Sequence, residues 1–122
     1  MSRVFVVQNQ QRKNKDTGKL YPAFNISPAE QFGTIIYLLG PNARPFERVS
    51  SDFPEFEATR ILREMKMKLR DYSDEDYLLL IGNPCFIGFA VALAAAVNKG
   101  KVRVLQWHGI SKKYIPVKAN LI

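Results

Sequence analysis

The chain has 122 residues, of which 47% are hydrophobic and 24% are charged, and its formal net charge is +7. This length fits one domain with one buried core, and the composition excludes a disordered chain. The single cysteine excludes an intrachain disulfide framework and a zinc site with four cysteine ligands, and together with the lack of a secretory leader it favours a cytoplasmic protein.

The charge is unevenly distributed along the chain. Residues 1–26 carry five basic groups and one acidic group. Residues 27–76 carry seven basic and ten acidic groups, and residues 77–122 carry six basic groups and no acidic group. A C-terminal third without a carboxylate favours attraction to phosphate or to an acidic partner, unless the cations only keep the surface soluble.

The first part of the chain predicts two strands separated by a polar segment and a short helix. Residues 3–8 (RVFVVQ) are β-branched and aromatic, which predicts a strand, and residues 9–19 form an exposed basic loop or hairpin tip. Ser27 is the predicted N-cap of a short helix that ends at Gly33, and residues 34–39 (TIIYLL) predict a second, apolar strand.

A longer helix is predicted after the following loop. Asp52 is the expected N-cap, with Pro54 in the first turn, and apolar residues then recur at spacings of four and three. The predicted buried stripe consists of Ala58, Leu62, Met65, Leu69 and Tyr72.

Residues 77–109 predict a strand, a tight turn, an apolar helix and another strand. Gly82 supplies the turn and Asn83 is the predicted N-cap of a helix without polar side chains. Residues 77–97 are uncharged over a length that could cross a membrane, but the turn divides them into two capped pieces. We therefore expect no membrane span.

Strands joined by helices of crossover length predict a mostly parallel sheet. We expect one α/β domain over residues 1–122, with a mixed, mostly parallel sheet of four to five strands, two main helices and a C-terminal β-hairpin. The strands near residues 34, 77 and 101 are expected to form the parallel centre, and the first strand is expected at an edge.

Alternation along the C-terminal hairpin places basic and aromatic side chains on one face. If the register aligns the two strands, this face and the adjoining turn form a surface for nucleic acid, because bases stack on aromatic rings and phosphates meet cations. The candidate nucleic-acid-binding residues are Lys101, Arg103, Trp107, Lys112, Lys113, Tyr114 and Lys118. The alternative is that Trp107 and Tyr114 pack as a cross-strand pair and the lysines are only solvated.

Two smaller groups of residues are candidates for anion binding and for catalysis. Gly82 and Asn83 precede a helix N-terminus, where anions bind, but no glycine-rich phosphate fingerprint accompanies them and capping is the simpler role. Cys85 and His108 would share one sheet edge as a nucleophile and its base, although the apolar neighbours of the thiol favour an inert, buried cysteine. We expect no metal site and no cofactor.

These patterns leave three functions open. The first is a non-catalytic basic binding module whose partner is nucleic acid or an acidic host protein that processes nucleic acid. The second is an oligomerising protein that uses the apolar helix 84–97, in which case glutamate at Ala94 or Ala95 would disrupt the oligomer. The third is a small cysteine-dependent enzyme.

Three segments of the chain carry a family resemblance: RVFVVQ, TGKLYPAFNISPAEQFG, and DYSDEDYLLLIGNP followed by an alanine-rich helix. Together they resemble a set of small proteins encoded by tailed phages and prophages, over most of the chain. The resemblance implies an accessory protein made in a bacterial cytoplasm during infection, and it implies no activity, cofactor or catalytic residue.

Overall fold

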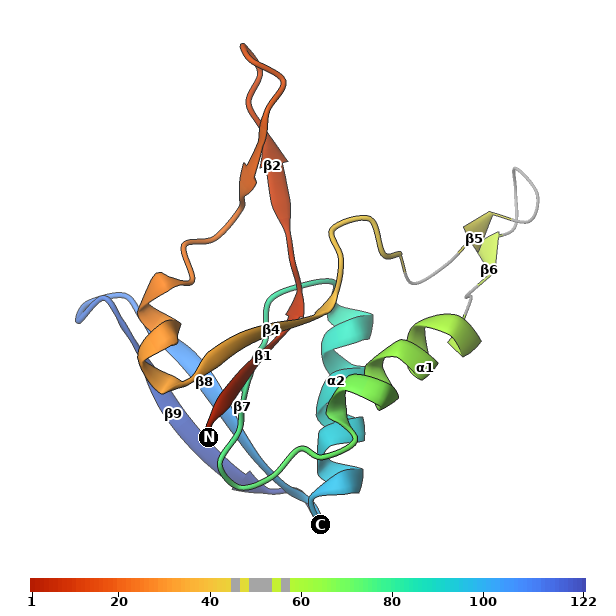
Figure 1. The fold of residues 1–122 in the computed structure, drawn as a ribbon, viewed down its shortest axis with the longest axis vertical. Helices are drawn as coiled ribbons and strands as arrows, with labels where there is room; N and C mark the ends of the chain where they lie inside the picture. The colour runs from red at the N-terminus through yellow and green to blue at the C-terminus, as the bar shows by residue number, and fades with distance from the viewer. Residues whose placement is uncertain (45–46, 49–53, 56–57) are drawn as a thin grey trace.

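The central sheet has five strands in the order β4-β1-β7-β8-β9 (Figure 1). A computed structural model describes residues 1–44, 47–48, 54–55 and 58–122. The first four strands of this order are parallel, and only β9 runs antiparallel to its neighbour. The strands are β4 (Thr34–Leu39), β1 (Arg3–Gln8), β7 (Tyr77–Leu79), β8 (Lys101–His108) and β9 (Lys113–Asn120). The predicted α/β fold with a mostly parallel sheet and a C-terminal hairpin is confirmed.

The first strand lies inside the sheet rather than at its edge. β1 pairs in parallel with β4 on one side and with β7 on the other. Four consecutive residues of β1, 4–7, are at most 1% exposed, as expected for a strand that is covered on both faces. The predicted edge position of residues 3–8 is therefore wrong, and β1 separates two of the strands that were expected to be adjacent.

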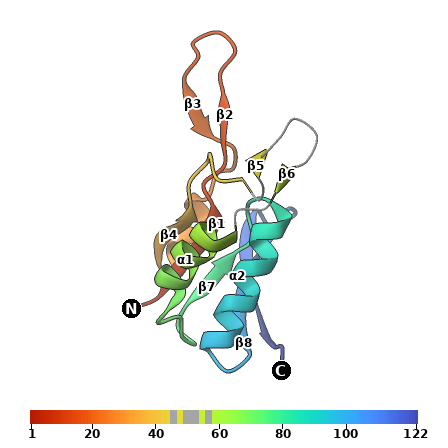
Figure 2. The ribbon, with the colours of Figure 1, turned by 90° about the vertical axis from the view of Figure 1, so that its right-hand side faces the viewer.

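The handedness of the crossovers explains which elements cover each face of the sheet. The connections from β4 to β7 and from β7 to β8 step across the sheet in the same direction, so right-handed crossovers place both helices on one face. These helices are α1 (Ala58–Leu69) and α2 (Pro84–Val97), and Figure 2 shows them side by side in front of the sheet. The connection from β1 to β4 steps the other way, so the 3-10 helix η1 (Ser27–Phe32) covers the opposite face.

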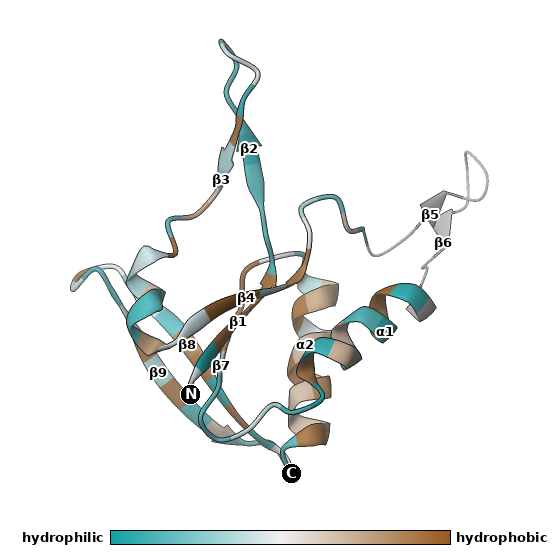
Figure 3. Ribbon diagram, viewed as in Figure 1, coloured by the Kyte–Doolittle hydropathy of each residue, from teal (hydrophilic) through white to brown (hydrophobic). Residues whose placement is uncertain are grey.

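The two faces of the sheet bury two separate cores of very different extent. The core under the helices includes Phe5, Met65 and Phe86, all fully buried, and apolar residues run through the central strands and α2 (Figure 3). The core on the η1 side is smaller and includes Ala29 and Tyr114. Because η1 has only six residues, it covers this face incompletely.

A hairpin arm projects from the sheet (Figure 1). It consists of β2 (Gln11–Lys13) and β3 (Leu20–Pro22), which pair antiparallel. At its tip, the Asn14 side-chain oxygen accepts hydrogen bonds from the backbone N–H groups of Asp16 and Thr17. The predicted exposed basic segment 9–19 is thus largely a hairpin, and all its residues from 11 to 19 are exposed. A second short antiparallel pair comprises β5 (Glu47–Arg48) and β6 (Pro54–Glu55).

The predicted starts of the first two helices differ from the structure. η1 contains Ser27 as a helical residue, and its N-cap is Ile26, which makes no side-chain capping bond. Pro54 belongs to β6 rather than to the first turn of α1, and the predicted cap Asp52 lies outside the described residues.

The buried stripe of α1 agrees with the predicted one at Met65 and Leu69, but Ile61 takes the place predicted for Leu62. Ile61, Met65 and Leu69 recur at a spacing of four and are at most 3% exposed, whereas Leu62 is only half-buried. Tyr72 continues this stripe after the helix, as predicted. The burial of the Ala58 side chain is outside the described part of the chain.

The turn into α2 has the predicted chemistry. Asn83 is the N-cap, and its side-chain oxygen accepts a hydrogen bond from the Cys85 N–H at 2.9 Å. Gly82 has φ +143°, a value that glycine adopts readily and other residues rarely do. Over the described ranges, no helix combines the length and the apolar character that crossing a membrane requires.

Candidate nucleic-acid interface

The register of the C-terminal hairpin is the one that the candidate surface requires. Trp107 pairs with Tyr114 and Arg103 pairs with Lys118, so these four side chains emerge on the same face of the sheet. Lys113 pairs with His108 and therefore belongs to the opposite face.

Two of the candidate residues, Tyr114 and Arg103, make contacts with other side chains and with the backbone of the protein itself. Tyr114 is 7% exposed, its ring meets Trp107 edge-on at 5.0 Å between centroids, and burial raises the pKa of its hydroxyl. The Arg103 guanidinium lies 4.0 Å from the centroid of the Tyr77 ring and donates a hydrogen bond to the Asp76 carbonyl. Trp107 and Tyr114 therefore pack as a cross-strand pair, while Trp107 stays 46% exposed, and nucleic-acid binding by these residues stays a prediction.

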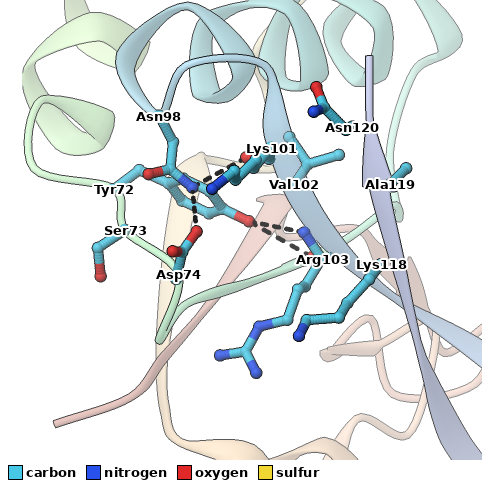
Figure 4. Close-up of a pocket in the computed structure, with 10 residues that line it drawn as sticks. All are labelled: Tyr72, Ser73, Asp74, Asn98, Lys101, Val102, Arg103, Lys118, Ala119 and Asn120. Carbon is cyan, nitrogen blue, oxygen red and sulfur yellow. Dashed lines mark hydrogen bonds between the residues drawn. The ribbon is translucent and has the colours of Figure 1, made fainter. Parts of the chain in front are cut away.

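Most of the candidate residues divide between the two ends of the C-terminal hairpin. Lys101, Arg103 and Lys118 line a pocket of about 340 Å³ at the amino-terminal edge of the sheet, where Arg103 and Lys118 lie side by side (Figure 4). Asp74 lies in the same pocket and accepts a hydrogen bond from the Asn98 amide at 2.9 Å. That hydrogen bond and the nearby cations lower the pKa of Asp74, whose negative charge offsets part of the positive charge of the pocket.

Trp107 and Lys112 lie at the opposite, carboxyl-terminal end, roughly 20 Å from Lys101 at about 3.3 Å per strand residue. Here the structure has a groove of about 770 Å³ that includes the ends of β7 and β8. It is open because the short η1 leaves this part of its face uncovered. The lining residues are Phe24, Asn25, Pro28, Leu79, Leu80, Ile81, Val104, Leu105, Gln106, Trp107, Lys112 and Tyr114.

The groove presents three large apolar side chains to solvent. Trp107 is 46% exposed, Phe24 is 47% exposed and Leu80 is 36% exposed. Lys112 is the charged side chain of the lining. An apolar surface with aromatic faces and a cation at its rim can bind a planar, anionic ligand.

Phe24 and Leu80 were not among the candidates that the sequence indicates. Phe24 follows the arm in a segment without hydrophobic periodicity, so no pattern marks it. Leu80 belongs to a run that predicts a buried strand, but β7 ends at Leu79, and the Ile81 N–H donates to the Leu79 carbonyl at 2.9 Å. The chain turns there and leaves Leu80 exposed.

Phe24 connects the groove to the hairpin arm. It also lines a smaller pocket of about 320 Å³ together with Arg12 at the base of the arm. The four basic side chains of the arm are exposed, and none forms an ion pair with any residue that the structure describes. These residues are Arg12, Lys13, Lys15 and Lys19.

Carboxylates gather at the other edge of the sheet. Asp71, Asp74, Glu75 and Asp76 all precede β7 and therefore lie toward its amino-terminal end. Asp76 is 1% exposed and pairs with Arg3 at 2.8 Å. The arm and the groove are thus separated from this acidic cluster by the length of the sheet.

Gly82 and Asn83 are held in place by the protein itself. The Asn83 N–H donates to the side-chain oxygen of Gln8 at 3.0 Å, and the Gln8 amide donates to the carbonyls of Gly40 and Ala43. A shallow pocket of about 450 Å³ does lie beside them. These hydrogen bonds favour the structural role, and anion binding at this turn stays a prediction.

Cys85 and His108 are both exposed, so the expected burial of the cysteine is wrong. The first turn of α2 carries the thiol on its solvent side. His108 Nδ1 lies 2.6 Å from the Ser111 hydroxyl oxygen, and within the described ranges no hydrogen bond joins His108 to Cys85. Nor does that part of the chain contain a group of three histidine, cysteine or acidic residues that could hold a metal ion.

The sequence model of a family described as phage Pam3 gp32-like protein matches residues 2–121, nearly the whole chain. No curated protein and no solved structure matches the chain.

Proposed function

The chain belongs to the phage Pam3 gp32-like protein family, so its resemblance to phage-encoded proteins is confirmed, and we propose that it is a non-catalytic nucleic-acid-binding accessory protein. Its place of action in this proposal is the cytoplasm of the infected bacterium. The observation that carries the proposal is the set of exposed cations on the arm, which form no ion pair with the described residues; the arm adjoins an apolar groove with exposed aromatic rings.

Electrostatics decides how strongly such a surface attracts nucleic acid. Each cation that neutralises a phosphate releases a counterion, and for single strands the slope of log affinity against log salt is about −0.7 per contact. If the four cations of the arm and Lys112 all contact phosphates, the slope is about −3.5. Affinity then falls by about 100-fold between 50 and 200 mM salt.

The test measures binding of labelled 20-nucleotide DNA and RNA by fluorescence anisotropy across this range of salt. Replacement of Lys13, Lys15 and Lys19 by alanine removes three cations from the arm without touching a packed side chain. We expect this variant to bind more weakly at 50 mM salt and to show a slope about 2 units shallower.

The matched control removes the same charge from α1. Arg63 and Lys66 are exposed on this helix and Arg70 is exposed directly after it, and the helix covers the other face of the sheet. Their replacement by alanine should leave the salt slope within experimental error of the parent. No binding at 50 mM salt, or equal losses in the two triple variants, would contradict the proposal.

A second candidate function is self-association through α2, and a specific observation favours it. The solvent side of a helix in a globular protein is usually polar. In α2 it consists of Cys85, Gly88, Ala92 and Ala96, all exposed and all without a charged or amide group. Small side chains at a spacing of four allow two helices to approach closely.

The structure shows that self-association through α2 is tested at a different position from the two that the sequence suggested. Ala94 and Ala95 are 0% and 7% exposed, so glutamate there would disrupt the core under the helices rather than an oligomer. Ala92 is exposed and is the appropriate position. If α2 joins two copies, sedimentation velocity will show a dimer for the parent and a monomer for Ala92→Glu; an unchanged size would refute this function.

A further inference from the structure

We propose that the groove lined by Phe24 and Trp107 takes unstacked bases, so that the nucleic-acid partner of this protein is single-stranded. The inference rests on the proposed function and deepens it by naming the substrate class. It needs two properties of the site: aromatic faces that a base can reach, and positive charge where the backbone would run.

The aromatic faces are available, and that of Trp107 is held in place. Trp107 and Phe24 are both nearly half exposed, although they come from segments more than 80 residues apart in the chain. Trp107 is supported from below by its edge-on contact with Tyr114, which is itself buried in the core on the η1 side. A ring that is fixed before binding loses little conformational entropy when a base stacks on it.

The chemistry of the lining favours the bases of a nucleic acid over its sugar-phosphate backbone. The groove is apolar apart from Lys112 and a few amides, so it can bury the faces of bases but offers little to a sugar-phosphate chain. In a duplex these faces are stacked on one another and cannot reach Trp107. Single strands expose them, and proteins hold single strands by stacking bases on aromatic rings beside a basic track.

Charge complementarity selects an anionic occupant. Lys112 lies at the groove, and Phe24 connects the groove to Arg12 at the base of the arm. A strand with a base on Trp107 and another on Phe24 would continue along the arm, where Lys13, Lys15 and Lys19 are exposed. An apolar protein segment would fill the same groove but would gain nothing from these cations.

The experiment uses the emission of Trp107, which is the only tryptophan of the chain and so reports on the groove alone. The protein is titrated at 50 mM salt with three probes of equal length: a 12-nucleotide oligothymidylate, a 12-base-pair duplex, and a 12-unit abasic deoxyribose-phosphate oligomer. Anisotropy of a label on each probe reports binding independently. We expect the oligothymidylate to quench the emission and to bind about tenfold more tightly than the abasic oligomer.

Substitutions then show whether Trp107 and Phe24 carry the affinity for bases. Trp107→Ala and Phe24→Ala should each weaken binding of the oligothymidylate by about tenfold and leave binding of the abasic oligomer unchanged. Trp107→Phe keeps an aromatic face and should restore most of the affinity, which separates stacking from a loss of folding. Met67→Ala removes an equally exposed apolar side chain from α1 and should change nothing.

The outcomes separate this inference from the function on which it rests. Salt-dependent binding of all three probes with equal affinity and unchanged Trp107 emission would overturn the inference and leave the proposed function intact; the groove would then be open to a protein segment. Tighter binding of the duplex would also overturn it. No binding of any probe at 50 mM salt would refute the proposed function itself.

Discussion

Replacement of Asp76 by alanine is expected to destabilise the fold by about 3 kcal/mol without affecting the groove. Asp76 is 1% exposed and its carboxylate accepts hydrogen bonds from the backbone N–H, Nε and Nη2 of Arg3 at 3.1, 3.2 and 2.8 Å. It also accepts one from the Ser73 N–H at 2.9 Å. These bonds join the start of β1, at the centre of the sheet, to the turn that precedes β7.

The magnitude follows from what remains after the carboxylate is removed. Breaking a buried ion pair by deleting one partner costs about 3–5 kcal/mol, because the other charge is left without compensation. The Arg3 side chain is 26% exposed and keeps an ion pair with Asp71 at 2.9 Å, so the lower end of this range applies. A domain of this size is stable by about 5–15 kcal/mol, and the loss would be a large share of that.

Urea denaturation followed by circular dichroism measures the difference. The control is Glu75→Ala in the same turn, because Glu75 is 70% exposed and, among the residues that the structure describes, forms its one ion pair with the N-terminal amine at 3.6 Å. We expect it to change the free energy of unfolding by less than about 0.5 kcal/mol. A loss below about 1 kcal/mol for Asp76→Ala would refute the reasoning, since hydration of Arg3 would then replace the buried contacts.

Two further predictions concern the glycines of the α2 region and the response to acid. Gly82 has φ +143°, and a Cβ added there would lie 2.7 Å from the Gln8 Cβ, so Gly82→Ala should lower the free energy of unfolding by about 2 kcal/mol or more. A Cβ added at Gly88, inside α2, would meet nothing within 4 Å, so Gly88→Ala should raise the free energy of unfolding by about 1 kcal/mol in the same urea titrations. Hydrogen bonds to their carboxylates lower the pKa of Asp71 and of Asp74 from the ordinary 3.8. Their stabilisation is therefore present above about pH 4 and is lost as the pH falls through the lowered values, so the urea midpoint should drop between pH 5 and pH 3. The double variant Asp71→Asn, Asp74→Asn should show a smaller drop, and an equal drop would contradict the assignment.

The sequence predicts well those features that depend on neighbouring residues. The turn at Gly82 and Asn83 is such a case, since the capping bond forms within three residues. The faces of the C-terminal hairpin are another, because alternation fixes which side chains of each strand share a face, whereas the register between the two strands came only from the structure. The exposed basic arm also follows from local composition alone.

Features that depend on distant segments could not be predicted in the same way. The central position of β1 is set by its pairing with β7, more than 70 residues later, and residues 3–8 contain no signal for that partner. Tyr114 alternates with exposed residues like any strand residue, and only the packing of η1 makes its face a core. Phe24 joins Trp107 only because the segment after the arm passes over the end of β8.

The topology of the sheet gives a physical reason why the binding surface that we propose and the buried ion pair lie at opposite ends of the strands. One long crossover returns over the η1 face, and its helix is too short to cover the ends of β7 and β8, so hydrophobic surface stays open at the carboxyl edge. The amino edge is instead anchored by the ion pair between Arg3 and the buried Asp76. The Arg3 guanidinium at this end is neutralised by the carboxylates of Asp76 and Asp71. Carboxylates at the binding surface would repel a phosphate chain. Among the residues that the structure describes, the acidic cluster lies at the far end of the strands from the arm. A domain of 122 residues can therefore combine a charged anchor at one end with the surface that we propose for an anionic partner at the other.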